Sequence, residues 1–369
     1  MKILVTGASG FIGKNLIAEL RNQGYEEIQL FTRANQLSEL KGMTADCDFV
    51  FHLAGVNRPK EESEFEEGNA VLVEALIKAL EHNQNTCPVL MTSSSQAELD
   101  NPYGESKRRG EQILFGHRQR SGASVYIYRL PNVFGKWCKP FYNSVVATFC
   151  HQIARGEALQ ISDPDKMMTL VYIDDVIKEF LRALKGAPEI NGQYCMVTTL
   201  HQISLGRLAD KLIAYGKNRE TLIMPALYTD LDKALYGTFL HYLPQDKFSY
   251  PLKKNEDNRG WLAEFIKSEE MGQVFVSRTK PGITRGNHWH HTKVEKFLVI
   301  QGQGVVRFRD IFTEEVIEYR VDGEQPEVVD IPVGYTHSIV NVGDGDMITL
   351  FWASEMLHPE RPDTYYVEV

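Results

Sequence analysis

Residues 2–13 read KILVTGASGFIG, and this stretch decides the fold of the first half of the chain. The apolar run KILVT predicts a buried strand at Lys2–Thr6, and three glycines follow it at once: Gly7, Gly10 and Gly13. An amphipathic pattern from Phe11 to Asn22 predicts a helix directly after the loop. A strand, a glycine loop and a helix N-terminus together offer close backbone approach and free N–H groups to a pyrophosphate. The spacing is GxxGxxG rather than GxGxxG, so the flanking strand and helix are what make nucleotide binding the favoured interpretation over a simple glycine turn.

Strands and helices continue to alternate after this unit. We expect strands at Ile28–Thr32, Asp48–Leu53, Val89–Thr92 and Ser124–Arg129, and helices at Ala70–His82 and Pro102–Arg118. This alternation predicts an α/β Rossmann-like fold, a doubly wound parallel sheet with helices on both faces. The segment between Arg33 and Asp48 is too brief for a long helix, so the crossover there is expected to be short or irregular.

The character of the chain changes near residue 245. A segment mixing Pro, Asn and charge, LPQDKFSYPLKKNEDNRG, precedes many short strand-like runs separated by Gly, Asp and Pro. We expect these strands at Gln273–Val276, Lys296–Ile300, Gly304–Phe308, Val316–Arg320, Val328–Ile331 and Met347–Trp352. Evenly spaced short strands predict an all-β barrel or sandwich. The expected domains are therefore residues 1–245, α/β, and residues 246–369, all-β.

Composition excludes several classes of protein. With 43% hydrophobic and 24% charged residues, the 369-residue chain is an ordinary globular one rather than disordered or fibrous. A net charge of -9 disfavours non-specific nucleic-acid binding. We see no signal peptide and no membrane span. The five cysteines are odd in number, widely spaced and free of CxxC, which indicates reduced thiols and a cytoplasmic location.

The end of the second expected strand bears on cofactor choice. An NAD site usually has an acidic residue there for the ribose 2′-hydroxyl, whereas this strand ends Leu30-Phe31-Thr32-Arg33. A guanidinium favours a 2′-phosphate, so Arg33 indicates NADPH rather than NADH. The alternative is that Arg33 is a solvated surface charge.

Tyr103 and Lys107 lie four positions apart at the start of an expected helix, with Asn101 as its N-cap and Pro102 in its first turn. This spacing places both side chains on one helix face. We expect the Lys107 ammonium to lower the pKa of the Tyr103 phenol. The phenol then exchanges a proton with a substrate oxygen while hydride moves at the attached carbon.

Taken together, these motifs resemble the extended short-chain dehydrogenase/reductase family over residues 1 to about 240. The matching stretches are TGASGFIG (Thr6–Gly13), HLAG (His52–Gly55), SSS (Ser93–Ser95), YGESK (Tyr103–Lys107), RLPNVFG (Arg129–Gly135) and YIDDV (Tyr172–Val176). The resemblance implies a catalytic set of Ser94, Tyr103 and Lys107, with Ser93 and Ser95 as alternatives for the serine, and a nucleotide-sugar substrate. Sugar-dehydrating members carry an acidic residue just after this serine or threonine; Ser95 and Gln96 stand here, which favours simple carbonyl reduction. The cofactor-binding residues it implies are Gly7, Gly10, Phe11, Ile12, Gly13, Arg33, Leu53, Ala54, Gly55, Tyr103 and Lys107.

A histidine cluster marks the second expected domain. His288 and His290 are two positions apart, so on a strand their side chains point to the same face. Glu295 follows five positions after His290, and His337 lies further along the chain. Three imidazoles and a carboxylate form a nitrogen and oxygen set for Zn²⁺, with iron or manganese less favoured. The alternative is a run of polar surface histidines, which the distant His337 makes less plausible.

This stretch resembles the cupin family, whose fold is an all-β jelly roll. Its first motif, G-x5-H-x-H-x4-E-x6-G, is met by Gly282, His288, His290, Glu295 and Gly302, and its second by Pro332, Gly334, His337 and Asn341. The leading glycine of the second motif is replaced by Pro326, a turn position rather than a ligand. Cupins carry out many reactions, so the match implies fold and metal site more firmly than reaction.

The order of the two domains resembles a family of bifunctional capsular polysaccharide synthesis enzymes. That resemblance implies that the cupin domain epimerises C3 of UDP-2-acetamido-2,6-dideoxy-4-hexulose, and that the reductase domain then reduces the C4 ketone with NADPH. The product is UDP-2-acetamido-2,6-dideoxy-L-talose, a precursor of UDP-N-acetyl-L-fucosamine; the family also implies zinc and a homodimer. The alternative is a single-activity NADPH-dependent 4-keto nucleotide-sugar reductase with a structural zinc cupin. For the epimerisation base, His291, Lys296 and Tyr335 all remain candidates.

Overall fold

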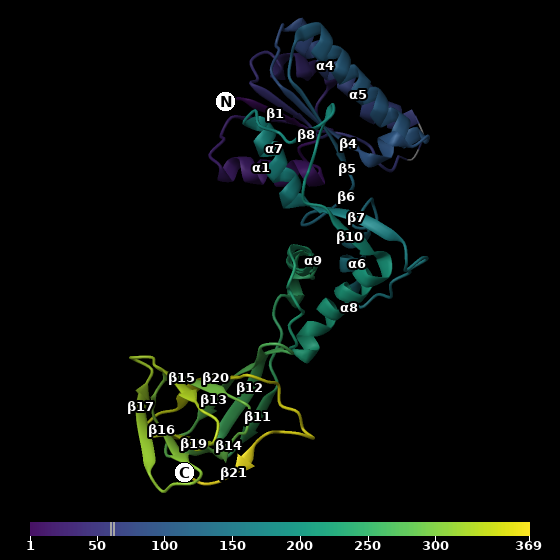
Figure 1. The fold of residues 1–369 in the computed structure, drawn as a ribbon. Helices are drawn as coiled ribbons and strands as arrows, with labels where there is room; N and C mark the ends of the chain where they lie inside the picture. The colour runs from purple at the N-terminus through teal and green to yellow at the C-terminus, as the bar shows by residue number, and fades with distance from the viewer. Residues whose placement is uncertain (60, 62) are drawn as a thin grey trace. The chain divides into compact units, whose positions relative to one another are not determined.

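The computed structural model describes residues 1–59, 61 and 63–369. The chain forms two compact units, which Figure 1 draws as ribbons. The first contains Met1–Ile213 and Leu227–Pro244, and the second contains Ala214–Ala226 and Gln245–Val369.

A seven-stranded sheet of order β2-β1-β3-β4-β5-β9-β8 organises the first unit. Its strands are β1 (Ile3–Thr6), β2 (Ile28–Phe31), β3 (Phe49–His52), β4 (Val89–Ser94), β5 (Val125–Leu130), β8 (Ile190–Asn191) and β9 (Tyr194–Cys195). All neighbours pair in parallel except β8, which is antiparallel to β9. The chain order reverses between β1 and β3, and ligands of such sheets bind outside the carboxyl ends of the strands at this point.

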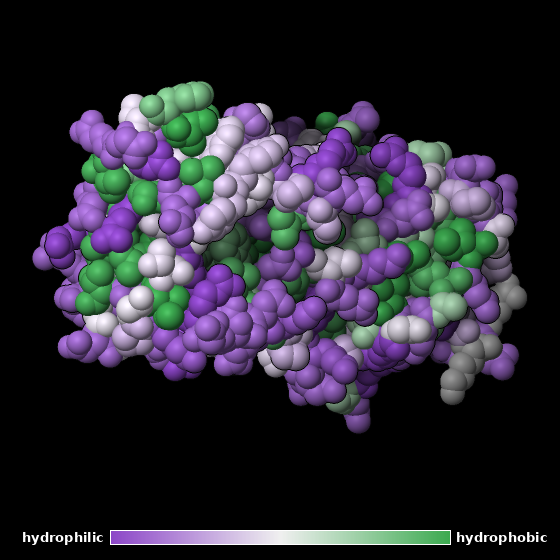
Figure 2. Space-filling model, turned by 90° about the horizontal axis from the view of Figure 1, so that it is seen from below, coloured by the Kyte–Doolittle hydropathy of each residue, from purple (hydrophilic) through white to green (hydrophobic). Residues whose placement is uncertain are grey.

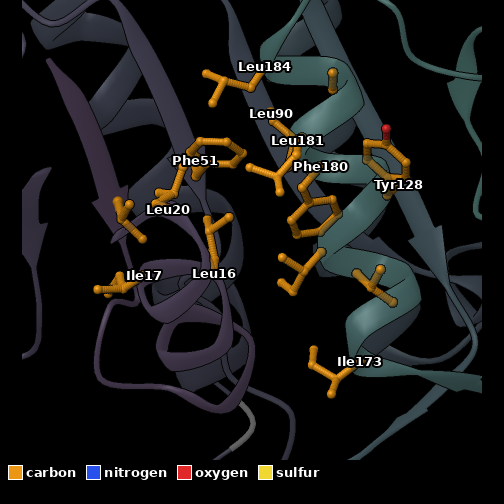
Figure 3. Close-up of a cluster of buried hydrophobic side chains, with 14 of the residues drawn as sticks. Leu16, Ile17, Leu20, Phe51, Leu90, Tyr128, Ile173, Phe180, Leu181 and Leu184 are labelled. Atoms are coloured by element: carbon orange, nitrogen blue, oxygen red, sulfur yellow. The ribbon is translucent and has the colours of Figure 1, made fainter. Parts of the chain in front are cut away.

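Helices cover both faces of the sheet (Figure 1). The helices of this unit are α1 (Phe11–Asn22), α2 (Leu40–Met43), α3 (Ser63–Glu66), α4 (Leu72–His82), α5 (Pro102–Ser121), α6 (Val145–Ile153), α7 (Ile173–Leu184), α8 (Leu205–Thr221, which continues into the second unit) and α9 (Asp230–His241). Helices α1 and α7 pack on one face through a buried cluster that includes Leu16, Leu20 and Phe180 (Figure 3). A second buried cluster joins α4 and α5 to the other face through residues such as Leu76 and Leu114.

The predicted α/β alternation is confirmed, and most element ends agree to within a few residues. The crossover after β2 is irregular as expected, because it holds only a 3-10 turn (Leu37–Glu39) and the one-turn helix α2. The expected helix at Ala70–His82 begins as a π-helical turn, Glu67–Val71, before α4. Short 3-10 turns also occur at Ser95–Glu98 and Gln245–Lys247.

A small three-stranded sheet of order β10-β7-β6 completes the first unit. Its strands are β6 (Asn132–Phe134), β7 (Met167–Tyr172) and β10 (His201–Ser204). The loop after β6 is anchored by α9 and the residue that follows it: the Tyr242 hydroxyl donates to the Cys138 carbonyl oxygen at 2.5 Å, and the Trp137 N–H donates to His241 Nε2 at 3.0 Å.

The second unit consists of two antiparallel sheets. The six-stranded sheet has the order β11-β12-β13-β20-β15-β18, and the five-stranded sheet has the order β17-β16-β19-β14-β21. The strands are β11 (Lys254–Asp257), β12 (Gly260–Ser268), β13 (Gly272–Thr279), β14 (Thr284–Trp289), β15 (Glu295–Gln301), β16 (Gln303–Asp310), β17 (Val316–Asp322), β18 (Val328–Ile331), β19 (Tyr335–Asn341), β20 (Met347–Ala353) and β21 (Tyr365–Tyr366). Their inner faces share one buried cluster, to which both sheets contribute, for example Phe297 and Phe351 from one and Phe308 and Ile339 from the other.

The surface mixes polar and apolar side chains. On the face drawn in Figure 2, hydrophobic residues form separate groups among hydrophilic ones. Among the described residues, no helix combines the length and the apolar character that crossing a bilayer needs.

Candidate active site and metal centre

The glycine loop between β1 and α1 is shaped for close backbone approach. Gly7 has φ +69, and a Cβ atom there would lie 2.6 Å from the Ala54 backbone nitrogen. A Cβ atom on Gly13 would lie 2.4 Å from the Gly7 carbonyl oxygen. The N-cap of α1, Gly10, has no side chain to cap the helix, and no acidic residue stands in its first turn. The first N–H groups of α1 therefore remain available to an anionic group.

A cavity of about 710 Å³ opens at the carboxyl ends of the strands. It is lined by nearly all of the predicted cofactor residues: Gly7, Gly10, Phe11, Ile12, Gly13, Arg33, Leu53, Gly55, Tyr103 and Lys107. Ala54 is the exception, because its backbone packs against Gly7 instead. Arg33 is an exposed part of the lining, which leaves its guanidinium accessible to a ligand in the cavity.

Helix α5 carries Tyr103 and Lys107 into this cavity. Asn101 caps the helix by accepting from the Gly104 N–H at 2.8 Å, and Pro102 occupies its first turn, as predicted. Lys107 Nζ lies 6.0 Å from the centre of the Tyr103 ring and donates to the Thr92 carbonyl oxygen at 3.4 Å. A Cβ atom on Gly55 would lie 2.9 Å from Lys107 Nζ, so the glycine leaves room for the ammonium group.

The pKa of Tyr103 shifts in the direction opposite to our expectation. Burial raises the pKa of the phenol, a hydrogen bond with the Ser94 side chain opposes the rise, and Lys107 is not among the groups that shift it. Burial also lowers the pKa of Lys107 to about 8, although Glu111 favours its charged form. The expected lowering of the Tyr103 pKa by Lys107 was therefore wrong, because burial of the phenol has the largest effect on this pKa. A phenol that stays protonated is nevertheless suited to donate a proton in a reduction.

All three candidate serines line the cavity, but their hydroxyl groups have different partners. Ser93 Oγ is buried and donates to Glu111 Oε1 at 2.5 Å. Ser94 Oγ accepts from the Gln96 N–H at 3.2 Å and interacts with Tyr103. This arrangement favours Ser94 over Ser93 as the serine that faces a substrate carbonyl.

Two cations of the first unit, Arg129 and Lys136, are engaged by carboxylates. Arg129 donates through Nη2 to Glu111 Oε2 at 2.6 Å and through Nε to Glu111 Oε1 at 2.9 Å. Lys136 Nζ lies 2.5 Å from Asp174 Oδ1. Arg129 is therefore neither a free surface charge nor a free cation for a ligand phosphate, because its partner Glu111 is buried.

The loop after β6 supplies cavity residues that sequence reasoning passed over. Trp137, Lys139, Tyr142 and Asn143 all line the cavity, as do Asn132 and Gln96. Trp137 has φ +67, a conformation that L residues rarely adopt and that functional loops often retain. The sequence signal for these residues is the dense aromatic and basic stretch after PNVFG. Among the aromatic residues of this region, Tyr142 lines the cavity, Phe149 is buried in the core and Phe141 is exposed.

The four predicted metal ligands come together in the second unit. Ligand atoms of His288, His290, Glu295 and His337 all lie within 4.8 Å of one another. Three strands position them: His288 lies near the end of β14 and His290 just beyond it, Glu295 begins β15, and His337 lies on β19. Phe297 packs against His337, with ring centres 5.7 Å apart, and closes the inner side of the cluster.

Unsatisfied buried nitrogens test whether this cluster fits a metal ion. His290 Nε2 and both ring nitrogens of His337 are buried and have no hydrogen-bond partner among the described residues. The Nε2 atoms of His290 and His337 lie 3.5 and 3.3 Å from Glu295 Oε2. Burial lowers the pKa of His288 to about 4, which leaves its ring neutral. Burial alone would raise the pKa of Glu295, but the imidazoles of His290 and His337 hold the pKa of this carboxyl below its usual range. Three imidazoles and one carboxylate form a donor set that Zn²⁺ takes.

Of the three candidate bases, one shares the inner face of the metal cluster. Tyr335 and His337 alternate on β19, and Tyr335 packs against the same buried cluster as Ile339. Lys296 points outward from β15 and pairs with Asp330. His291 is exposed and contacts the Tyr365 ring, with centres 5.0 Å apart. Trp289 contacts the ring of Tyr365, with centres 5.2 Å apart, because β21 pairs with β14 there.

Comparison with known proteins decides the family. Residues 3–194, slightly more than half of the chain, match the NAD dependent epimerase/dehydratase family. The chain belongs to this family. Residues 255–365 match the polysaccharide biosynthesis C-terminal domain. The nicotinamide class of cofactor follows from the family, and the Rossmann-like prediction is confirmed.

Two relatives are similar over their whole length. The chain is 45% identical over 369 residues to UDP-2-acetamido-2,6-beta-L-arabino-hexul-4-ose reductase of Pseudomonas aeruginosa, covering 100% of this chain and 99% of the relative. The crystal structure of the capsular polysaccharide assembling protein CapF from Staphylococcus aureus has 49% identity, a TM-score of 0.94 and coverage of 100% of both chains. A UDP-glucose 4-epimerase of Thermotoga maritima, with 19% identity, a TM-score of 0.53 and coverage of 66% of this chain and 98% of its own, shares the fold of the first part.

Proposed function

We propose that the chain is a bifunctional nucleotide-sugar enzyme with residues 1–245 as reductase and residues 246–369 as epimerase. The substrate is UDP-2-acetamido-2,6-dideoxy-4-hexulose, the epimerisation is at C3, and the C4 ketone is then reduced to give UDP-2-acetamido-2,6-dideoxy-L-talose for capsular polysaccharide synthesis. The observation that carries the proposal is the presence of two separate reactive centres in one chain: the set Ser94, Tyr103 and Lys107, and the cluster His288, His290, Glu295 and His337. The similarity to a UDP-hexulose reductase over the full length supports it.

In the reductase half, the roles follow from placement. NADPH supplies the hydride, and the exposed Arg33 is the residue we assign to its 2′-phosphate. Ser94 donates to the C4 carbonyl oxygen and Tyr103 delivers the proton, which its raised pKa keeps available. Lys107, whose pKa burial lowers to about 8, lines the same cavity, and we assign its ammonium group to cofactor binding.

In the epimerase half, the cluster would bind Zn²⁺ through His288, His290, Glu295 and His337. Bound there, the ion supplies Lewis-acid stabilisation of charge on a carbonyl oxygen. Tyr335, on the same face of β19 as His337, is the residue we assign to proton transfer at C3. The order of the two reactions follows from chemistry, because the C3 proton is acidic only while C4 is a ketone.

We assign a homodimer in the cytoplasm, with no nucleic-acid or membrane partner. Exposed apolar side chains on the edge strand β17, Val316, Ile317 and Tyr319, support a protein contact, and five free cysteines support a reducing compartment.

Product analysis with and without metal tests the function. The Zn²⁺-loaded protein, given the 4-keto UDP-sugar and NADPH, is expected to yield the talo product, identified by NMR. Chelator-treated protein is expected to reduce the ketone without inverting C3. An identical product from both preparations supports the alternative, a single reductase with a structural zinc site.

A further inference from the structure

The C-terminal segment lies directly against β14, the strand that carries His288 and ends just before His290. Strand β21 pairs with β14, with His288 opposite Tyr366 and Trp289 opposite Tyr365. Beyond it, the Val367 N–H donates to the Asn287 carbonyl oxygen at 3.1 Å. The residues just before β21, at positions 362–364, reach the loop that leads from His290 to Glu295.

Asp363 is the centre of this contact. Its carboxylate accepts three consecutive backbone N–H groups, those of His291 at 3.0 Å, Thr292 at 2.9 Å and Lys293 at 2.9 Å. The Thr292 hydroxyl adds a fourth hydrogen bond at 3.0 Å. A carboxylate that satisfies three adjacent N–H groups fixes the path of the loop between two ligand candidates.

The backbone of Asp363 acts on a ligand itself. His290 Nδ1 lies 2.6 Å from the Asp363 carbonyl oxygen. Since a carbonyl oxygen carries no hydrogen, Nδ1 must be the donor, and in the neutral ring Nε2 is then the unprotonated nitrogen. That Nε2 atom is the one that is buried without a partner and lies 3.5 Å from Glu295 Oε2.

A lysine closes the other side of the loop. Lys293 is only 7% exposed, and its Nζ donates to Thr364 Oγ1 at 2.9 Å and to the Pro362 carbonyl oxygen at 3.3 Å. Loop and tail therefore bind each other in both directions, through Asp363 toward the loop and through Lys293 toward the tail.

We propose that Asp363 is a positioning residue of the metal centre: its carboxylate sets the loop between His290 and Glu295, and its carbonyl group selects the His290 tautomer that directs a bare Nε2 at the other ligands. This inference rests on the proposed metal centre and extends it to the C-terminal segment, which neither cupin motif includes. Groups that orient a ligating imidazole through its second nitrogen commonly change metal affinity by about 10- to 100-fold when they are removed.

Glycine and asparagine substitutions test the carboxylate, since both leave the Asp363 backbone carbonyl group in place. Asp363 has φ +36, which glycine and asparagine tolerate, so Asp363→Gly removes the carboxylate with little backbone strain and Asp363→Asn retains one acceptor oxygen. Asp322 provides a matched control, because its carboxylate accepts the N–H groups of Glu324 and Gln325, both at 2.9 Å, in a turn that holds no ligand.

The test measures Zn²⁺ affinity of the full chain by chelator competition, the visible spectrum of the Co²⁺-loaded protein, and NADPH binding. Asp363→Gly is expected to weaken Zn²⁺ binding about 10- to 100-fold and to alter the Co²⁺ spectrum, Asp363→Asn to restore part of both, and Asp322→Ala to match wild type; NADPH binding stays unchanged in all. Wild-type affinity and an unaltered Co²⁺ spectrum in Asp363→Gly overturn the inference alone, whereas a wild-type protein that binds no Zn²⁺ overturns the proposed metal centre and the inference with it. If Asp363→Gly does not fold, Asp363→Asn takes its place, and an affinity equal to wild type then overturns the inference.

Discussion

Glu111→Gln removes the charge from a carboxylate that is only 2% exposed and that three side chains share. Arg129 donates to it twice, at 2.6 and 2.9 Å, Tyr194 donates at 3.0 Å and Ser93 at 2.5 Å. Neutralising one partner of a buried ion pair costs about 3 kcal/mol of unfolding free energy, because the Arg129 charge then keeps only the exposed Glu98 as its partner. For a unit of this size the denaturant dependence is about 3 kcal/mol per molar urea, so the midpoint is expected to fall by about 1 M.

Glu98→Gln is the matched control, because Glu98 pairs with the same arginine from the surface. Its carboxylate lies 3.0 Å from Arg129 Nη1 and is 71% exposed. An exposed pair of this kind contributes less than about 1 kcal/mol. The assay is urea unfolding of both variants, followed for the transition that added NADPH shifts upward. Equal midpoint shifts in the two variants would refute the claim that the buried Glu111–Arg129 pair stabilises this unit more than the exposed Glu98–Arg129 pair.

Four further outcomes follow from the two centres. Tyr103→Phe is expected to abolish NADPH oxidation and to leave solvent exchange at C3 intact; equal loss of both activities, measured spectrophotometrically and by NMR, contradicts the division of labour. His290→Ala is expected to lose metal and C3 exchange and to keep NADPH binding, and exchange that persists in the metal-free variant counts against it. Arg33→Ala is expected to lose most of its preference for NADPH over NADH; a wild-type ratio of kcat/KM for NADPH to kcat/KM for NADH would contradict this. Because the pKa of Lys107 is lowered to about 8, its charged form is lost as the pH rises through that value, so the reduction rate is expected to fall above about pH 8; a flat profile to pH 9.5 is inconsistent with this.

The elements that the sequence predicted best are those in which apolar residues follow a single helix or strand pattern along the whole element. The helix at Phe11–Asn22 and the strands β1 and β3 belong to this class, because both faces of the sheet are covered and these two strands are buried along their whole length. Strands β14 and β19 escaped detection by pattern because the site itself displaces apolar residues from them. Each carries ligand candidates on its inner face, and β14 also contains Asn287 at φ 62.

The candidate site residues were reachable from sequence where a spacing encodes geometry. Tyr103 and Lys107 lie about one helix turn apart, and His290 follows His288 by two positions at the end of β14, so the proximity within each pair follows from the spacing in the sequence. Partners that meet only through the tertiary fold were not reachable in this way. Asp363 and Glu111 belong to this second class, since the first reaches His290 from the far end of the chain and the second, on helix α5, binds Arg129 of strand β5. Burial was also outside sequence reasoning, and it reversed the expected direction of the Tyr103 pKa shift.

The central claim is that carbon–hydrogen exchange beside the ketone comes before hydride delivery. The most direct measurement follows C3 of the 4-keto UDP-sugar by NMR in deuterated water with Zn²⁺-loaded full-length protein, first without NADPH and then after its addition. We expect deuterium to enter C3 before any NADPH is present, and the reduced sugar to carry that deuterium with inverted C3 configuration. A reduced sugar that retains its original hydrogen and configuration at C3 would contradict the account.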